Sequence, residues 1–144
     1  MSKVHIKICG IKDIKTAEYA IKYGASFLGF IFFENSKRNI TISKCREILN
    51  QIEGKVNTVA VTVDPTYHDL KIYSKMKFTH LQLHGNETID KVKKINETYN
   101  FKIIKSFSIS QISDLNNIGK YFPYIDHILL DSKQKKGMPG GTGQ

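Results

Sequence analysis

Two side chains able to exchange protons stand at the ends of apolar, strand-like segments. Cys9 ends the segment that begins at Val4, and Asp131 directly follows Leu129 and Leu130. A thiol beside a glycine is approachable, and a nearby cation or helix dipole can stabilise its reactive thiolate form. A carboxyl group at the end of a buried strand needs a partner or a task, because burial penalises its charge. A small buried cysteine and a turn or capping aspartate would suit the same positions, so position alone leaves these alternatives open.

Two further residues could bind a charged group or move a proton. Arg38 is one of only two arginines among 22 basic residues, and it lies in the polar segment after an apolar run. A guanidinium binds a carboxylate through two parallel hydrogen bonds, whereas the alternative is an ordinary solvated charge. His84 precedes Gly85 at the end of another apolar segment. It is either a proton carrier or a hydrogen-bonded residue at the rim of the fold, and we favour the rim role.

Residues 137–143 form a glycine-rich segment that contains Gly141, Thr142 and Gly143. Glycine backbones can approach an anion closely, so the segment resembles a loop that binds phosphate or covers a site. It is not a P-loop, because Gln144 stands where the phosphate-binding lysine would be needed. The segment therefore indicates an anionic ligand without identifying it.

A metal centre and a disulfide framework are not expected. Cys9 and Cys45 are the only cysteines, and neither they nor the five histidines show the spacing of metal ligands. Cys45 lies on the apolar stripe of an expected helix, which indicates a structural role.

Strand-like and helix-like patterns alternate along the whole chain. The expected strands cover residues 4–9, 27–32, 58–63, 78–83, 102–107 and 127–130, and the expected helices lie around 14–21, 43–52, 70–76, 89–99 and 111–118. Gly24 is placed to close the first helix, Asn86 to cap the start of the fourth, and Asp64 before Pro65 to form a turn. Such alternation predicts an α/β fold with parallel strands, as a single domain over residues 1–144.

Periodicity leaves two architectures open, an open doubly wound sheet and part of a (β/α)₈ barrel. Polar residues and glycines gather at the carboxyl ends of several expected strands. Both architectures place their sites at that end of the sheet. The site is therefore expected there in either case.

Composition narrows the function classes. The chain has 144 residues, 40% of them hydrophobic, and a net charge of +9. Its lysines are dispersed, whereas a nucleic-acid-binding protein more often gathers its charge on one element, so we give nucleic-acid binding little weight. The excess positive charge favours an anionic small molecule. We also expect no membrane association and a cytoplasmic location, since no long apolar run or secretory signal is present.

Six segments resemble the phosphoribosylanthranilate isomerase family in the order in which they occur. These segments are Lys7-Ile8-Cys9-Gly10-Ile11, Gly29 to Phe32 followed by Ser36-Lys37-Arg38, Leu81 to Gly85, Ile104 to Phe107, Leu129 to Ser132, and Gly140 to Gln144. The resemblance implies a (β/α)₈ TIM barrel of tryptophan biosynthesis that performs an Amadori rearrangement of a phosphorylated aminoaldose. It implies no metal or organic cofactor.

The resemblance also implies roles for individual residues. Cys9 would be the general base, Asp131 the general acid, and Arg38 a ligand of the anthranilate carboxylate. Further substrate-binding positions would be Gln82, His84, Gly141, Thr142 and Gly143. The chemistry agrees with these roles: a protonated carboxyl can open the furanose ring, and a thiolate can then remove the proton acidified by the resulting imine.

The chain departs from the family in two residues and in length. Lys37 replaces a frequent proline beside Arg38, and Ser26 replaces a frequent aspartate. The family continues through strands seven and eight, so the resemblance implies a barrel truncated after strand six, with strands one and six exposed as edges. We expect residues 1–144 alone to be weakly active or inactive, because phosphate usually binds the loops after strands seven and eight. The alternative is a non-catalytic remnant or interaction fragment; the oligomeric state is left open.

Overall fold

The computed structural model describes residues 4–132, which form alternating strands and helices. The strands are β1 (Lys7–Cys9), β2 (Phe27–Phe32), β3 (Asn57–Thr62), β4 (His80–Leu83), β5 (Lys102–Ile109) and β6 (His127–Ser132). The helices are α1 (Ile14–Lys22), α2 (Ile42–Ile52), α3 (Tyr67–Tyr73), α4 (Ile89–Thr98) and the 3₁₀ helix η1 (Ile112–Tyr124). The predicted α/β class is confirmed.

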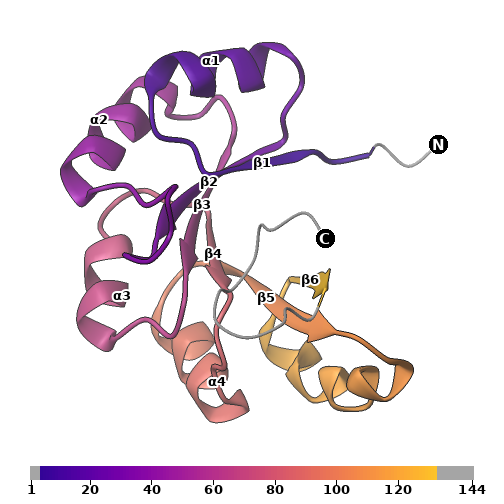
Figure 1. The fold of residues 1–144 in the computed structure, drawn as a ribbon. Coiled ribbons are helices and arrows are strands. Elements are labelled where there is room, and N and C mark those ends of the chain that lie inside the picture. Colours follow the sequence, from indigo (N-terminus) through magenta and orange to yellow (C-terminus); the bar gives the residue numbers. More distant parts are fainter. Residues whose placement is uncertain (1–3, 133–144) are drawn as a thin grey trace.

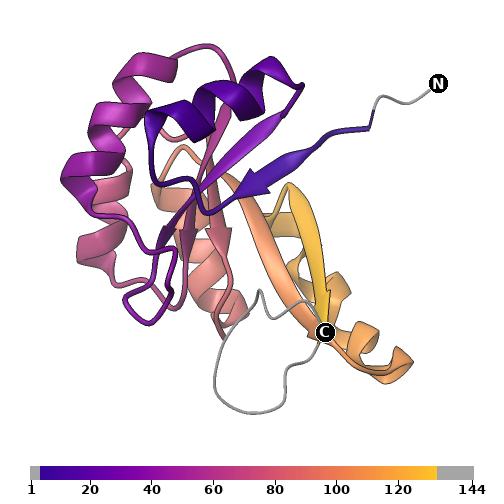
Figure 2. The same ribbon diagram turned by 45° about the horizontal axis from the view of Figure 1, so that its top comes forward.

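All six strands are parallel and lie in sequential order from β1 to β6. A doubly wound sheet reverses its strand order near the middle, whereas a barrel adds each strand beside the last. The helices follow the outside of the curved sheet around an arc (Figure 1), and the turned view shows the same curvature (Figure 2). The described part of the chain is therefore a half-barrel.

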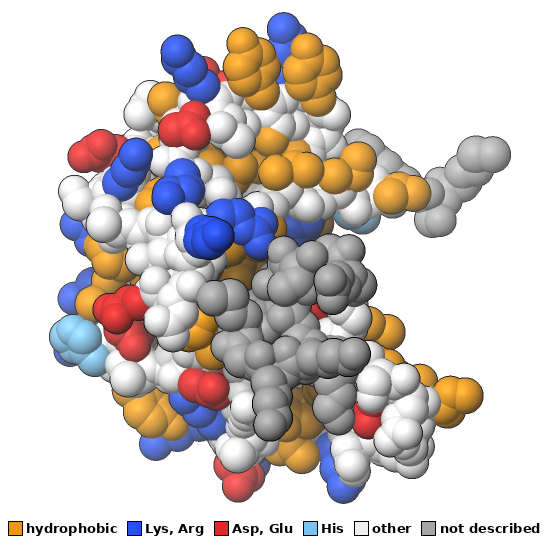
Figure 3. All heavy atoms as spheres, in the orientation of Figure 1, with side chains coloured by type: hydrophobic (Ala, Val, Ile, Leu, Met, Phe, Trp, Pro, Cys, Tyr) orange, Lys and Arg blue, Asp and Glu red, His pale blue; other side chains and the backbone are white. Residues whose placement is uncertain are grey.

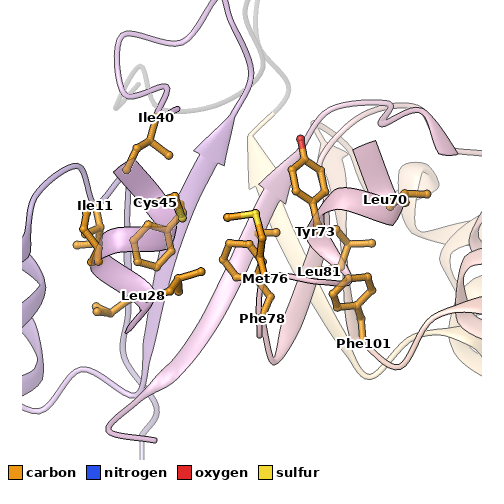
Figure 4. Close-up of a cluster of buried hydrophobic side chains, with 14 of the residues drawn as sticks. Ile11, Leu28, Ile40, Cys45, Leu70, Tyr73, Met76, Phe78, Leu81 and Phe101 are labelled. Atoms are coloured by element: carbon orange, nitrogen blue, oxygen red, sulfur yellow. The ribbon is translucent and has the colours of Figure 1, made fainter. Parts of the chain in front are cut away.

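The main core fills the space between the helices and the outer face of the sheet. Leu28 of β2, Cys45 of α2 and Leu81 of β4 are among its side chains (Figure 4). Phe30 of β2 belongs to the same cluster. Removing each large apolar side chain from water contributes about 1.5–3 kcal/mol. Burial also raises the pKa of the Cys45 thiol to about 12, so the predicted structural role of this cysteine is confirmed.

A smaller apolar cluster lies on the inner, concave face of the sheet. It contains Ile31, Val59, Val61 and Ile104, which alternate along their strands with residues of the main core. Because both faces of β2 are covered by apolar groups, this strand is a continuous apolar run in the sequence.

The residues at the ends of two helices confirm one prediction and correct another. Gly24 follows α1 with a φ of +93°, as expected of a glycine that ends a helix. Asn86 does not cap α4: the cap is Thr88, whose hydroxyl accepts the N–H of Lys91 at 3.3 Å. Asn86 instead donates its backbone N–H to Asp64 Oδ1 at 3.0 Å. The chain bends at Asp64, whose φ is +45°, as expected of a turn there.

Several element boundaries differ from the sequence-based expectation; the third helix, for example, is α3 (Tyr67–Tyr73) rather than 70–76. β1 pairs only with β2, whose register with it starts at Lys7, so the strand is shorter than residues 4–9. β4 starts at His80 rather than at residue 78. The last helix is longer than expected and of the 3₁₀ type, with Pro123 inside it, where proline removes a backbone donor.

β1 and β6 are the two edges of the sheet within residues 4–132. Their outward-facing side chains are exposed, with Ile8 at 40% and Leu130 at 57%. No helix among the described residues is long and apolar enough to span a membrane.

Candidate active site

A cavity of about 220 Å³ opens on the inner face of the sheet at the carboxyl ends of its strands. Its walls come from β1, β2 and the loop after it, β3, β4 and β6. Five of the predicted site residues line it: Cys9, Arg38, Gln82, His84 and Asp131. Cys9 and Asp131 are more than 120 positions apart in the sequence, and the fold brings them to one cavity.

Cys9 is the last residue of β1, and its thiol is half-buried in the cavity wall. It pairs across the sheet with Gly29 of β2. A Cβ atom at position 29 would lie 3.0 Å from Cys9 Sγ and 3.3 Å from Val61 Cγ2. Contacts this short are strained, so glycine at position 29 is what leaves room for the thiol.

Arg38 reaches from the loop after β2 back to β1. Its Nη1 donates to the carbonyl oxygen of Cys9 at 3.1 Å. The guanidinium stem crosses Gly10, where a Cβ would lie 2.6 Å from Arg38 Cδ and where φ is +89°. The glycine after Cys9 therefore serves both the tight turn and the placement of Arg38.

Asp131 lies near the carboxyl end of β6 and faces His84 across the cavity. His84 Nε2 is 3.4 Å from Asp131 Oδ2, and the two side chains are 16% and 29% exposed. Gln82 Nε2 lies 2.9 Å from the other ring nitrogen, Nδ1. The histidine is thus held between an amide and a carboxylate in the wall of the cavity, directly after the carboxyl end of β4.

The environment of His84 disfavours its charged form. Burial lowers its pKa most, the negative charge of Asp131 opposes that shift, and the positive charges of Lys105 and Lys7 add to it. The net direction is downward from the usual value near 6.5. The ring is therefore neutral at pH 7.

Sequence analysis missed Lys7 as a site residue. It lines the cavity together with Cys9, two residues further along the same strand. Alternate residues of a strand share one face, so a reactive Cys9 already implied an inward-facing Lys7. Its ammonium group places positive charge in the wall of the site.

The pair Lys105–Glu87 was also missed. The two charged groups approach to 2.9 Å, with side-chain exposures of only 4% and 0%. Lys105 Nζ further donates to the carbonyl oxygens of Leu83, Gly85 and Ser106. A lysine inside the apolar run of an expected strand was the available signal, because a buried charge needs a partner.

Glu87 fixes the turn that follows β4. Its Oε1 accepts the backbone N–H groups of Asp64 at 2.9 Å and Gly85 at 3.1 Å. Its backbone carbonyl accepts the hydroxyl of Tyr121 at 3.1 Å. The buried ion pair consequently holds the chain immediately beyond His84.

Among residues 4–132 no group of three or more histidine, cysteine, aspartate or glutamate side chains is placed to hold a metal ion. Gly141, Thr142 and Gly143 lie outside the described residues. Lysine and arginine side chains are spread over the visible surface among other residue types (Figure 3). The positive charge relevant to the cavity is that of Lys7 and Arg38, which line it.

Reactive side chains at the carboxyl ends of sequential parallel strands define the class of β/α-barrel enzymes. Comparison with known proteins agrees, since the family model described as N-(5'-phosphoribosyl)anthranilate (PRA) isomerase matches residues 6–144. The chain belongs to this family. Curated relatives named N-(5'-phosphoribosyl)anthranilate isomerase include those of Sinorhizobium fredii, 40% identical, and Rhizobium etli, 41% identical, each over 98% of this chain.

Solved structures of the same family are similar in fold. The phosphoribosyl anthranilate isomerase of Thermotoga maritima has a TM-score of 0.84 and 32% identity, over 94% of this chain and 64% of its own. A phosphoribosyl anthranilate isomerase in complex with reduced 1-(o-carboxyphenylamino)-1-deoxyribulose 5-phosphate has a TM-score of 0.83 and 32% identity, over 90% of this chain and 66% of its own. The present chain spans 64% and 65% of the length of the two curated relatives.

Proposed function

We propose that this chain carries the acid, the base and the carboxylate ligand of an isomerase of tryptophan biosynthesis. The reaction is the Amadori rearrangement of N-(5-phosphoribosyl)anthranilate to its 1-deoxyribulose 5-phosphate product. The observation that carries the proposal is the meeting of Cys9 from β1 and Asp131 from β6 in one cavity beside Arg38. Membership of the isomerase family supports it.

The first step opens the sugar ring. Asp131, in its protonated form, gives its proton to the ring oxygen as the bond from that oxygen to the anomeric carbon breaks. The nitrogen lone pair forms the new carbon–nitrogen double bond, so the product is a protonated imine. The carboxyl group at the end of β6 lines the cavity from the side opposite to β2, which suits a proton donor facing a bound ring.

The second step moves a proton from carbon. The Cys9 thiolate removes the proton from the carbon next to the imine, and the electron pair left behind neutralises the imine nitrogen. The resulting enolamine then tautomerises to the ketone. The imine itself accepts the electrons, so no cofactor is required by this chemistry.

Arg38 orients the aromatic end of the substrate. Its guanidinium lines the cavity while one nitrogen is held by the Cys9 carbonyl, which leaves further N–H groups to bind a carboxylate. The product analogue bound by the related structure carries both a carboxyphenyl group and a phosphate. The partner proposed here is likewise a phosphorylated small molecule; nucleic acid and membrane partners are not proposed, and the location is cytoplasmic.

We propose weak or no turnover for residues 1–144 tested as an isolated polypeptide. The six described strands contain the proposed acid and base. In this fold, phosphate is usually bound by the loops after strands seven and eight. Gly141, Thr142 and Gly143 remain candidates for contact with the anionic substrate.

The proposal is tested in a bacterial strain that requires tryptophan because it lacks this isomerase. Residues 1–144 are expressed alone and together with the part of the Sinorhizobium fredii relative that this chain does not match. Growth with the added part, abolished by Asp131→Asn and kept by Cys45→Ala, would support the proposal. Stable expression of both parts without growth would contradict it.

A second candidate function is that of a non-catalytic interaction fragment. The exposed outward faces of β1 and β6 favour it, because uncovered sheet edges tend to pair with other chains. It predicts association with another polypeptide that is unchanged by Cys9→Ser and Asp131→Asn. Co-purification of the two expressed parts, with and without these substitutions, separates this role from catalysis.

A further inference from the structure

We propose that Gln82 and His84 are positioning residues that form a relay to Asp131 and set how many protons the His84–Asp131 pair holds. This rests on the proposed function and deepens it. Both residues then act through the proposed acid rather than as ligands of the substrate. The relay runs along β4 and across to β6.

The hydrogen-bond geometry fixes one state of the relay. Gln82 Nε2 lies 2.9 Å from His84 Nδ1, and an amide nitrogen can only donate. His84 Nδ1 is therefore an acceptor, and the proton of the neutral ring is on Nε2. That atom faces Asp131 Oδ2 at 3.4 Å, so this state pairs an N–H donor with an ionised carboxylate.

The second state follows from the other end of the amide. Gln82 is 2% exposed, and its Oε1 has no hydrogen-bond partner among the described residues. Turning the amide over places Oε1 against His84 Nδ1, which must then carry a proton. His84 Nε2 is left as an acceptor for a protonated Asp131, so this state holds one more proton than the first.

Neither orientation of the amide is strongly favoured by its own hydrogen bonds. In each of them one polar group of Gln82 bonds to His84 and the other is left buried, and a buried unpaired group costs about 1–3 kcal/mol. The two states consequently differ mainly in proton count. This makes Gln82 a sensitive control of the proton affinity of the pair.

The surroundings keep the ring in place and disfavour the imidazolium form. The backbone N–H of His84 donates to the carbonyl of Thr62 at 2.8 Å, and the hydroxyl of Thr62 donates to the carbonyl of Gln82 at 2.9 Å. The charged groups whose electrostatic fields act on the ring are Lys7 from β1, Lys105 from β5 and Asp131 from β6.

Both lysines, together with burial, lower the pKa of His84. The extra proton of the second state is thereby directed to Asp131, where a general acid needs it. When Asp131 gives that proton to the ring oxygen of the substrate, a carboxylate remains. Its proton is replaced from water before the next turnover.

The test is nuclear magnetic resonance of the full chain with ¹⁵N-labelled histidine, which requires no turnover. In the wild type, the neutral His84 ring is expected to carry its proton on Nε2. Gln82→Glu offers only acceptors, so the proton should move to Nδ1 and the ring should titrate at a pH at least one unit higher. Asp131→Asn should move the titration in the opposite direction, because the carboxylate that favours the charged ring is removed.

Two further variants keep the test decisive. Gln82→Met keeps the volume of the side chain but removes the amide. In this variant the Nδ1 signal of His84 should move towards that of free histidine while the protein stays folded. His68, which is exposed on α3, is the internal control and should be unchanged throughout. The proposal would be overturned if the Nδ1 signal of His84 were the same in the wild type, Gln82→Glu and Gln82→Met. It would also be overturned if Asp131→Asn left the titration of His84 unchanged.

Kinetics distinguish positioning from substrate binding. Kinetics are measured with residues 1–144 expressed together with the unmatched part of the Sinorhizobium fredii relative. Gln82→Glu should shift the pH profile of kcat/KM upward by about one unit and change kcat through that shift, with KM changed less than threefold. A raised KM with unchanged kcat would show that Gln82 is a substrate ligand and overturn the proposal. Loss of the proposed function would appear as absent turnover with the resonance results intact, so the two failures are distinguishable.

Discussion

Two pairs of ionisable side chains lie on opposite faces of the sheet near the carboxyl end of β4. Lys105 and Glu87 are 2.9 Å apart on the helix side, almost without exposure, and each is tied to several backbone groups. His84 and Asp131 are 3.4 Å apart on the cavity side and partly exposed. The first pair is saturated with partners and holds the fold, whereas the second retains capacity to bind and exchange protons.

The largest expected effect on turnover comes from changing the His84–Asp131 pair. Asp131→Asn keeps the shape of the side chain but removes its transferable proton. We expect kcat to fall by about 10²–10⁴-fold, the usual contribution of a general acid. The free energy of unfolding should change by less than about 0.5 kcal/mol, because the site is partly solvated. Turnover within a factor of three of the wild type would contradict the assignment.

Breaking the buried pair should instead affect stability. Glu87→Gln leaves the Lys105 ammonium without its counter-charge, and removing one partner of a buried pair costs about 3–5 kcal/mol. Urea denaturation followed by circular dichroism measures this loss. The matched control is Glu53→Gln, which breaks the exposed Lys77–Glu53 pair and should cost at most about 1 kcal/mol. Equal losses in both variants would contradict the comparison.

The two histidines of β4 sharpen the comparison through pH. His80, at the amino end of the strand, is 3% exposed, and burial lowers its pKa to about 4, with smaller contributions in the same direction from His127 and Lys102. Because the unfolded chain binds this proton near pH 6.5 and the folded chain does not, stability falls as the pH drops from about 6.5 to 4.

The loss at His80 amounts to up to about 3 kcal/mol. In His80→Gln this part of the pH dependence should disappear, as measured by urea denaturation at pH 7, 5.5 and 4. His68→Gln, on the exposed surface of α3, is the control and should retain the slope of the wild type. The account would be contradicted if the free energy of unfolding of His80→Gln fell with decreasing pH as steeply as that of the wild type.

The smallest expected effect concerns the space beside the thiol. Gly29→Ala places a methyl group 3.0 Å from Cys9 Sγ, so the sulfur must shift by a few tenths of an ångström. We expect kcat to fall about tenfold, because small misplacements of a reacting group are costly. Gly119→Ala, where nothing lies within 4 Å, is the control for added methyl groups. Iodoacetamide labelling of Cys9 should change in the first variant only.

The parts of the fold that the sequence predicts best are those determined by local pattern. β2 was predicted over its full observed range, because a strand covered on both faces is a continuous apolar run. The capping residue of α4 was misassigned, since Asn86 and Thr88 are both good capping residues. Asn86 is diverted by Asp64, a contact between residues 22 positions apart that no local pattern reveals.

The residues of the candidate site also differ in how far the local sequence pattern reveals them. Their positions at strand ends made Cys9 and Asp131 candidates but left structural roles open, and only the resemblance to a family implied their catalytic roles. The contact of His84 with Asp131 and the pairing of Lys105 with Glu87 depend on which strands are neighbours. Sequential strand order, which the sequence left open between two architectures, is what brings these groups together.

The most direct test of the account follows one hydrogen atom. N-(5-phosphoribosyl)anthranilate is labelled with deuterium on the ribosyl carbon next to the one that bears nitrogen. Release of the label to water is measured with residues 1–144 expressed together with the unmatched part of the Sinorhizobium fredii relative. The account predicts release by the wild type and by Cys45→Ala, and retention by Cys9→Ser. Release by Cys9→Ser at the wild-type rate would show that another group is the base and would contradict the central claim.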